Sequence, residues 1–489
     1  MNSIYTAEQV RAFEKNLFIK KGDDLRAMME AAKQSVEILN KDFSTSEFLI
    51  LCGPGNNGGD GYFIGIGLSE LKKCVKFIDV LGHAKKSPLC EHAFKAAQDL
   101  DFINAKTLKD ISSKTVIVDA IFGIGGRIDL GRELEEILSD CNRFESKIAI
   151  DVPTGLDSNT GEISQACFNA DKTITFIGYK LGQRINEGKN YCGKLILKDL
   201  GFSMDKNVSP TVKELSFEDI KSNIPKRKEN SHKGDHGKLL IIAGDEGYGG
   251  AGTLVSETAI KTGAGLVKLL TRECYVASAL ARNPEVMVVG GDNAQDLESH
   301  FSWAEVFVCG PGMFHNYWSE QMLYKLIEYA QQNAVPTLLD AGALRLLEIE
   351  AFAQLTLPEN LIMTPHPGEA AGLLNISVKE VQADRLKAAK DLHLKFGGTV
   401  VLKGHGTIIY DGNTPYLCSV GGPELGIAGS GDVLSGLIGS LVSQGLEPMD
   451  AAIAGVALHS GAGNQFTKNT GVIGLAASEL IPLIRDLLN

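Results

Sequence analysis

Several short segments place polar side chains directly after runs of apolar residues. FLILC (48–52) leads into GPGNNGGDG (53–61), whose glycines alternate with Asn56, Asn57 and Asp60. Glycines serve a tight turn, and they also let a ligand approach the backbone. Free N–H groups at the start of a following helix bind anions. A tight turn alone does not require these polar residues, so this segment is predicted to bind a ligand.

Further apolar runs of the N-terminal half also end in, or are followed by, polar residues that could bind a ligand or transfer a proton. Asp119 ends TVIVD, Asp151 ends KIAID with Thr154 close behind, and Lys180 follows KTITF. Together with Asn57, the residues Asp119 and Thr154 offer oxygen ligands suited to a hard cation. Asp151 and Lys180 make a plausible acid/base pair. Each aspartate alone could simply cap a helix or turn, but four polar strand ends favour a site.

The C-terminal half has a different signal in GIAGSGDVLSG (426–436), which opens a helix with apolar residues at helical spacing. Gly429 to Gly431 bring N–H groups to the helix N-terminus, where they can stabilise a transferring phosphoryl group. Asp432 is placed to accept a proton from a substrate hydroxyl. The alternative is a glycine turn followed by an aspartate that favours the helix dipole.

Three companion segments strengthen the prediction of a phosphoryl-transfer site. KGHGT (403–407) lies at a strand turn suited to a nucleotide, and CGPGM (309–313) and TPHPGEA (364–370) follow two other strands. His366 lies between two prolines, which by itself is more typical of a rigid turn residue than of a base. The pair His232 and His236 lacks a third metal ligand, so we interpret it as structural.

The elements that must position these residues are short strands alternating with amphipathic helices, which is typical of a parallel α/β sheet. Ligands bind beyond the carboxyl ends of such strands. The pattern occurs once in each half, with a polar stretch between them and a boundary near residues 210–225. The strands predicted in the first half are 48–52, 115–119, 147–151 and 172–176, and those in the second are 237–244, 306–310, 337–340, 361–364 and 398–404, the last entering a hairpin.

Length and composition limit the class of protein. A chain of 489 residues is expected to form two to four domains. The net charge of -12 argues against a nucleic-acid binder, since phosphate binding needs a basic surface. No apolar run is long enough for a membrane helix and no secretory signal is present, so we expect a cytoplasmic protein. Nine cysteines without CxxC spacing predict free thiols.

GPGNNGGDG, DAIFGIGGR, DVPTGLDSNTG and TFIGYKLG together resemble the NAD(P)H-hydrate epimerase family. The resemblance implies a Rossmann-like domain over residues 1–212, with Asp151 contacting the substrate and Lys180 as its catalytic partner. It also implies a potassium ion at Asn57, Asp119 and Thr154. The chain departs from the family's second loop around Gly126. The implied substrate contacts are Asn56, Asn57, Gly58, Gly59, Asp60, Gly123, Ile124, Gly125, Gly126, Arg127, Ile128, Asp129 and Asp151.

HKGDHGKLLIIAG, GPGM, HPGEA, KGHGT and AGSGD together resemble the NAD(P)H-hydrate dehydratase family, a branch of the ribokinase-like fold, over residues 216–489. One departure is Gly342, where the family commonly has a second acidic residue. The implied substrate contacts are Ala251, Gly312, His366 and Asp432, and the implied adenine-nucleotide contacts are Lys403, Gly404, His405, Gly406, Thr407 and Gly431.

Epimerase and dehydratase segments in one chain resemble the bifunctional NAD(P)H-hydrate repair enzymes. The resemblance implies that the N-terminal domain interconverts the R and S hydrates of NADHX and NADPHX. The C-terminal domain would phosphorylate the C6 hydroxyl of the S hydrate from ADP or ATP with magnesium, ADP being favoured, and then eliminate phosphate. It also implies a homo-oligomer. The alternatives are a ribokinase-like vitamin-precursor kinase fused to a nucleotide-binding domain, and a non-catalytic nucleotide-binding protein.

Overall fold

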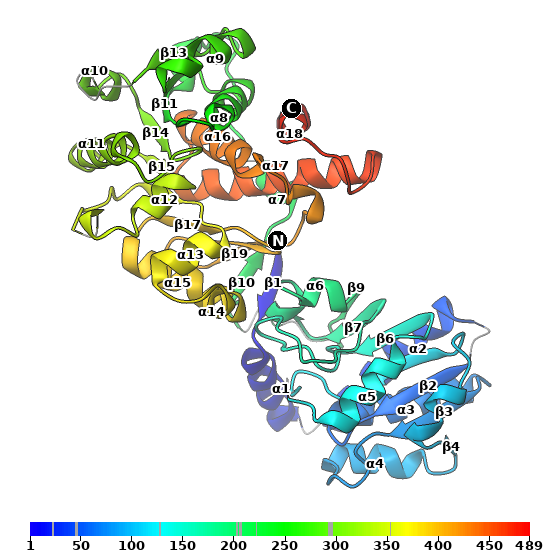
Figure 1. Cartoon of the computed structure of the whole chain (residues 1–489). Coiled ribbons are helices and arrows are strands. Elements are labelled where there is room, and N and C mark those ends of the chain that lie inside the picture. The colour runs from blue at the N-terminus through cyan, green and yellow to red at the C-terminus, as the bar shows by residue number, and fades with distance from the viewer. Residues whose placement is uncertain are drawn as a thin grey trace. The chain divides into compact units, whose positions relative to one another are not determined.

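The computed structural model describes residues 1–21, 24–44, 47–126, 129–201, 204, 208–221, 223–291, 297–352 and 354–489. It divides into two compact units, Ser3–Val212 and Lys213–Asn489, with Met1–Asn2 belonging to the second. Figure 1 shows the first unit in blue to cyan-green and the second in green to red. Arg127 and Ile128, which were predicted to contact the substrate, lie outside the described residues.

The first unit is built on a seven-stranded sheet in the order β4-β3-β2-β5-β6-β7-β9, and all its strand pairs are parallel. A short parallel pair, β1 with β8, lies outside that sheet. The elements are β1 (Asn2–Tyr5), α1 (Ala7–Lys21), α2 (Asp24–Asp42), β2 (Phe48–Cys52), α3 (Asn56–Glu70), β3 (Val75–Asp79), α4 (Pro88–Ala96), β4 (Asp101–Phe102), η1 (Ala105–Asp110), β5 (Val116–Ala120), α5 (Arg132–Cys141), β6 (Ser146–Ile150), β7 (Lys172–Phe176), β8 (Tyr179–Lys180), η2 (Leu181–Gln183), α6 (Gly188–Tyr191) and β9 (Lys194–Lys198).

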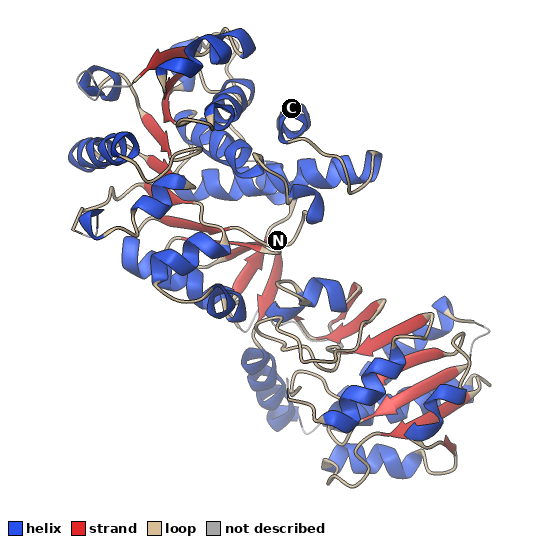
Figure 2. Ribbon diagram, viewed as in Figure 1, coloured by secondary structure: helices blue, strands red, loops and turns tan. Residues whose placement is uncertain are grey.

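Helices cover both faces of this sheet (Figure 2) because its central strands are apolar on both sides. In β2, Phe48 and Ile50 join one hydrophobic core with residues of α2, α3 and α4. Leu49 and Leu51 point to the opposite face and join a second core with residues of α5. The loops that follow these strands are therefore attached to a sheet that is packed on both faces.

The second unit has a sheet in the order β13-β12-β11-β14-β15-β16-β17-β18-β19-β10, parallel from β13 to β17 and antiparallel in the hairpin β17-β18-β19. Its elements are β10 (Val212–Glu214), α7 (Phe217–Lys221), η3 (Lys233–His236), β11 (Lys238–Ile242), α8 (Gly249–Lys261), β12 (Leu266–Thr271), η4 (Glu273–Tyr275), α9 (Val276–Arg282), β13 (Met287–Gly290), α10 (Leu297–Phe301), β14 (Val306–Cys309), α11 (Tyr317–Asn333), β15 (Thr337–Leu339), α12 (Gly342–Leu346), η6 (Glu350–Phe352), β16 (Leu361–Met363), α13 (Pro367–Leu374), α14 (Val378–Ala383), α15 (Arg385–Phe396), β17 (Thr399–Leu402), β18 (Thr407–Tyr410), β19 (Tyr416–Cys418), η7 (Pro423–Leu425), α16 (Ser430–Ser443), α17 (Pro448–Asn469) and α18 (Ala477–Leu488).

One face of this second sheet carries the main hydrophobic core. Leu239 and Ile241 of β11 pack there with apolar residues of α8, α16, α17 and α18. This packing fixes the N-terminus of α16, which carries Asp432, beside the carboxyl ends of the parallel strands. The prediction of α/β architecture with a parallel sheet is confirmed in both halves.

Two details differ from the sequence-based expectation. Helix α3 begins at Asn56, so the loop after β2 comprises only Gly53 to Gly55, and Asn56 to Asp60 lie in the helix. Strands β3 and β12 were not predicted, because VKFID and LVKLLT contain lysines that interrupt the apolar pattern. Both strands are nevertheless buried partners of predicted ones.

Several smaller expectations can be compared with the structure. All nine cysteines are free, as predicted. His232 caps the short η3 turn that leads into β11, because its Nδ1 accepts a hydrogen bond from Gly234 N at 3.2 Å. The pair His232 and His236 is therefore structural, as we interpreted it. Among the described residues, none of the helices has the length and apolarity needed to cross a bilayer.

Candidate active sites

Asp151 follows β6 directly, at the carboxyl edge of the first sheet, in an unusual backbone conformation. Its φ is 67°, in the left-handed region that non-glycine residues rarely adopt. Such a residue costs on the order of 1–3 kcal/mol and persists only where its surroundings hold it. Here Asp151 N donates to Ile174 O at 2.7 Å, and Gln183 Nε2 donates to Asp151 O at 2.7 Å. The strain therefore serves to aim the carboxylate.

Lys180 is the partner of that carboxylate. Its side chain is 1% exposed, and Nζ donates to Asp151 Oδ1 at 2.5 Å. The other two donors of the ammonium go to Thr175 Oγ1 at 2.9 Å and Phe176 O at 3.0 Å, so all three are used. The structure thus brings together the acid/base pair that the sequence suggested. Thr175 and Gln183, which hold the pair, were not predicted, because their contacts with Lys180 and Asp151 depend on how the chain folds.

The second glycine-rich loop approaches Asp151 from the other side. Ile124 N donates to Asp151 Oδ2 at 3.1 Å. A Cβ added to Gly123 would lie 2.8 Å from the same oxygen, so a side chain there would clash with the carboxylate. The loop is glycine-rich at this point because its backbone must come close to Asp151.

The three candidate cation ligands lie beside this loop. Asn57 Nδ2 donates to Ile150 O at 3.1 Å, whereas its buried Oδ1 has no hydrogen-bond partner. Asp119 accepts from Thr154 N at 2.7 Å and from Thr154 Oγ1 at 2.8 Å. Burial raises the pKa of Asp119 to about 6, against the lowering effect of these hydrogen bonds. Asp119 therefore braces the turn that carries Thr154, and Asn57 Oδ1 is left to accept a ligand.

Asn57 and Asp151 line a cavity of about 820 Å³. Most of the predicted substrate-binding residues that the structure describes line it, namely Asn56, Asn57, Asp60, Gly123, Ile124, Gly125, Asp129 and Asp151. The predicted contacts Gly58 and Gly59 pack α3 instead: an added Cβ would meet Gly53 O at 1.8 Å and the side chain of Met28 at 2.8 Å. Gly126 turns the loop, its N donating to Gly123 O at 2.9 Å.

In the second unit, Asp432 lies in the first turn of α16, whose N-cap is Gly429 with a φ of 87°. Burial and the charge of Asp340 raise the pKa of Asp432 to about 6, with Lys403 acting in the opposite direction. A carboxylate with this pKa is ionised at neutral pH and can still accept a proton readily. The geometry suits the proton acceptor that the sequence predicted.

Lys403 and Asp340 form an ion pair next to this helix terminus. Lys403 Nζ lies 2.8 Å from Asp340 Oδ1, and Ser435 Oγ donates to Asp340 Oδ2 at 2.7 Å. A Cβ on Gly431 would lie 3.4 Å from Lys403 Nζ. The KGHGT turn and the AGSGD turn are therefore neighbours. Asp340 was not predicted, although it follows β15 as Asp151 follows β6.

The KGHGT turn is shaped by a buried arginine. The Arg385 guanidinium donates to the carbonyl oxygens of Leu402, Lys403 and Gly406 at 3.2, 3.3 and 3.0 Å. Gly404 adopts a φ of 146°, and a Cβ there would lie 2.3 Å from Arg385. The predicted nucleotide-binding turn, which includes His405 and Thr407, is thus held rigidly from behind.

His366 is the N-cap of α13. Its Nδ1 accepts from Gly368 N at 2.9 Å and from Glu369 N at 3.2 Å. Burial and the charges of Lys403 and Arg345 lower the pKa of His366. The ring is therefore neutral near pH 7. His366 caps the start of the helix, as a structural residue would. Its ring is only half-buried, so it can also contact a ligand.

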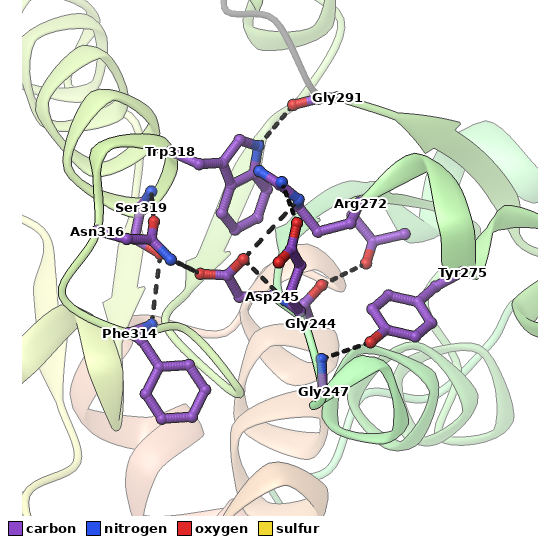
Figure 3. Close-up of polar contacts among 12 residues, drawn as sticks. Gly244, Asp245, Gly247, Arg272, Tyr275, Gly291, Phe314, Asn316, Trp318 and Ser319 are labelled. Atoms are coloured by element: carbon purple, nitrogen blue, oxygen red, sulfur yellow. Dashed lines mark hydrogen bonds and ion pairs between the residues drawn. The ribbon is translucent and has the colours of Figure 1, made fainter.

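Ala251 and Gly312 are in contact, because a Cβ on Gly312 would lie 2.9 Å from Ala251 Cβ. The Gly312 loop is held by Asp245, whose side-chain contacts are shown in Figure 3. Asp245 N donates to Gly312 O at 2.9 Å. The buried carboxylate accepts from Asn316 Nδ2 and, at 3.1 Å, from Ser319 Oγ. This network fixes the Gly312 loop relative to the start of α8.

The departure at Gly342 has a steric explanation. A Cβ at this position would lie 2.2 Å from Met313 O, so no side chain fits without moving the backbone. Asp340 provides the buried carboxylate of this region instead.

We therefore expect Gly342→Ala to lower the melting temperature of the second unit, with an overpacking cost of about 1–3 kcal/mol. Differential scanning calorimetry measures this shift. The matched control is Gly250→Ala, since a Cβ there meets nothing within 4 Å. An unchanged melting temperature for Gly342→Ala would contradict the steric explanation.

Comparison with known proteins gives a consistent picture for both units. Residues 25–182 match the family of the YjeF-related protein N-terminus, and residues 239–485 match the NAD(P)H-hydrate dehydratase family. The bifunctional NAD(P)H-hydrate repair enzyme Nnr of Escherichia coli is 34% identical over 100% of this chain and 94% of its own length. The chain belongs to the bifunctional NAD(P)H-hydrate repair enzymes. The corresponding enzyme of Coxiella burnetii is 35% identical over 100% of both chains.

Two solved structures resemble the dehydratase part of this repair enzyme. A ribokinase-like superfamily protein from Enterococcus faecalis aligns with a TM-score of 0.53 and 28% identity, covering 57% of this chain and 95% of its own. The ADP/ATP-dependent NAD(P)H-hydrate dehydratase from Bacillus subtilis, co-crystallised with ATP and Mg²⁺, aligns with a TM-score of 0.50 and 26% identity, covering 56% and 97%. The expected ribokinase-like fold is confirmed, and the chain is an epimerase and a dehydratase.

Proposed function

We propose that residues 1–212 carry the epimerase and residues 216–489 the dehydratase, each with its own acid/base centre. The observation that carries this assignment is the presence of a separate carboxylate–lysine centre in each unit: Asp151 with Lys180, and Asp432 beside Lys403. Each lies at the carboxyl edge of a parallel sheet, where α/β proteins bind ligands. A vitamin-precursor kinase would leave the first of these centres without a role.

The epimerase cavity suits a hydrated nicotinamide nucleotide, either NADHX or NADPHX. Its volume of about 820 Å³ is in the range of small-molecule and cofactor sites. The N-terminus of α3 offers N–H groups to a phosphate, and Asp151 meets the ring carbon that carries the hydroxyl. Lys180 holds the Asp151 carboxylate in orientation while the hydroxyl leaves and returns. The described contacts that line the cavity would surround the nucleotide, namely Asn56, Asp60, Gly123, Ile124, Gly125 and Asp129.

We further propose a potassium ion held by Asn57, Asp119 and Thr154. The buried, unpartnered Asn57 Oδ1 fits this proposal, since a buried amide oxygen without a partner is costly. Asp119 would supply negative charge, with backbone carbonyl groups completing an oxygen shell. The bound ion would fix the loop that carries Asp151 relative to α3.

Asn57→Ala should therefore reduce the rate of epimerisation and its stimulation by potassium, leaving dehydration of the S hydrate unchanged. Rates measured in potassium and in a bulky organic cation, with chromatographic separation of the epimers, test this. The control is Asn142→Ala, at an exposed helix end of the same unit. Equal loss of both activities in a folded Asn57→Ala protein would exclude this separate role.

In the dehydratase unit, Asp432 would accept the proton of the C6 hydroxyl as that oxygen attacks the terminal phosphoryl group of ADP or ATP. The N–H groups at Gly429 to Gly431 would stabilise the charge on the phosphoryl oxygens. The lone pair of the ring nitrogen then expels phosphate to form a C=N double bond, and loss of a proton from C5 restores the 5,6 double bond of NADH or NADPH. Phosphorylation matters because hydroxide is a poor leaving group.

The remaining proposals concern the ligand contacts of the dehydratase unit, the oligomeric state and the cellular compartment. We propose that Ala251, Gly312 and His366 contact the hydrate, and that residues 403–407 with Gly431 bind the adenine nucleotide together with magnesium. The Bacillus subtilis relative, described as ADP/ATP-dependent, supports either nucleotide, of which we favour ADP. A cytoplasmic homo-oligomer completes the proposal, and the nine free thiols agree with a reducing compartment.

The test is to incubate the purified protein with mixed NADHX epimers and either ADP or ATP, and to follow the absorbance of the reduced nicotinamide. We expect the S hydrate to return to NADH first and the R hydrate to follow. Failure to form NADH with either nucleotide would overturn the proposed function.

A further inference from the structure

Glu14 contributes a carboxyl group to the epimerase cavity from an element without any motif. It lies on α1, and it lines the cavity together with Asp60 of α3 and Asp151 after β6. Three carboxyl groups from three separate elements therefore line one cavity. Only Asp151 among them has a cationic partner at hydrogen-bond distance in the part of the chain that the structure describes.

The surroundings of Glu14 favour its protonated form. Burial and the charge of Asp151 raise the pKa of Glu14 to about 7, and the charges of Lys180 and Arg11 oppose this shift. Asp60 also has a raised pKa, for which burial, Asp151 and Glu14 are responsible. The other charged groups of the cavity wall are Lys85, Lys86 and Asp129. Near neutral pH, Glu14 is thus present in both the protonated and the ionised form.

Asp151 differs from Glu14 in its hydrogen bonds, because donors hold both of its carboxylate oxygens. Its Oδ1 accepts hydrogen bonds from Lys180 Nζ and from Thr175 Oγ1 at 3.2 Å. Its Oδ2 accepts from Ile124 N. All these groups donate to Asp151, so both carboxylate oxygens are used as acceptors, an arrangement that suits a proton acceptor. The cavity therefore needs a different group as donor.

The reaction at C6 requires both a donor and an acceptor. The hydroxyl must leave from one face of the ring and water must add to the other, because the configuration at this carbon is inverted. Loss of the hydroxyl is assisted when it departs as water, and addition is assisted when the incoming water loses a proton. Two groups on separate elements can serve the two faces, whereas one carboxylate held by Lys180 serves one.

We propose that Glu14 is a second catalytic residue of the epimerase, donating a proton to the leaving hydroxyl while Asp151 accepts one from the incoming water. The C6–O bond breaks as the lone pair of the ring nitrogen forms a C=N double bond, and the hydroxyl takes the Glu14 proton and leaves as water. A second water then forms the new C6–O bond and gives its proton to Asp151. Exchange with solvent returns both carboxyl groups to their starting forms. This proposal rests on the proposed epimerase role of the cavity.

The experiment compares Glu14→Gln with Glu37→Gln, the same change at an exposed position on α2. Pure R hydrate is incubated without ADP or ATP, so that only epimerisation is observed, and the epimers are separated by chromatography. We expect kcat for Glu14→Gln to fall by about 10²–10⁴-fold with little change in KM, as for loss of a general acid. Glu14→Asp should recover part of the rate. The wild-type rate should fall as pH rises through about 7, and this limb should be absent in Glu14→Gln.

Dehydration of pure S hydrate with ADP or ATP serves as an internal check of folding, and it should be equal in all variants. If Glu14→Gln epimerises at the wild-type rate with the wild-type pH profile, the proposal is overturned. It is also overturned if KM alone changes, since Glu14 would then only bind substrate. If the wild type and Glu37→Gln fail to interconvert the epimers, the epimerase assignment itself is wrong, and the Glu14 proposal falls with it.

Discussion

Asp432→Asn should slow dehydration of the S hydrate by about 10²–10⁴-fold, because it removes the group that accepts the hydroxyl proton but keeps its shape. Epimerisation should be unaffected, since the epimerase centre lies in the other unit. The matched control is Asp450→Asn, which makes the same change in the first turn of α17 at an exposed position. Initial rates on pure S hydrate with saturating nucleotide provide the measurement.

The same residue predicts the pH dependence of dehydration. Asp432 acts in its ionised form, and its pKa is raised to about 6. The value of kcat/KM should therefore rise with pH up to about 6 and then level off. Asp340→Asn should move this limb to lower pH, because it removes a negative charge and leaves Lys403 free to interact with Asp432. If the pH profile of Asp340→Asn rises at the same pH as that of the wild type, a group other than Asp432 is titrating.

Asp151→Asn should show the reverse pattern, with epimerisation lost and dehydration of the S hydrate kept. Epimerisation should fall by at least about 10²-fold, because the proton acceptor is lost. Lys180 would keep its hydrogen bonds to Thr175 and Phe176 but lose its counter-charge, so some loss of stability is expected as well. With mixed hydrates and nucleotide, only the S form should be consumed.

The control for this variant is Asp99→Asn, at an exposed position of the same unit. Thermal unfolding separates lost stability from lost catalysis, because a folded Asp151→Asn protein must still dehydrate the S hydrate at the wild-type rate. Consumption of both epimers by this variant would contradict the role assigned to Asp151.

The sequence predicted residues that directly follow strands better than residues that lie elsewhere. Asp119, Asp151 and Asp432 were predicted because parallel strands and helix N-termini present nearby residues to one edge of a sheet, and the structure places them near the end of β5, after β6 and in the first turn of α16. Lys180 was placed near the same edge, but its bond to Asp151 depends on a turn 29 residues away that only the fold defines.

Other residues gave no signal in the sequence. Glu14 lies on an ordinary amphipathic helix, and its carboxyl group reaches the cavity through packing between distant elements. Arg385 looks like a surface helix residue but is 1% exposed, because it fills the space behind the KGHGT turn. Gly342 was noticed as a departure, and its cause became apparent only from the closeness of Met313 O.

The most direct test of two independent sites is complementation in a mixture. Asp151→Asn and Asp432→Asn proteins are combined and supplied with mixed NADHX epimers and nucleotide, and NADH is followed by its absorbance. Alone, the first variant should convert only the S hydrate and the second should convert neither. The mixture should convert both epimers to completion, because the S hydrate released by one protein is dehydrated by the other. If the R hydrate persists in the mixture, the two activities do not reside in separable sites and the account is wrong.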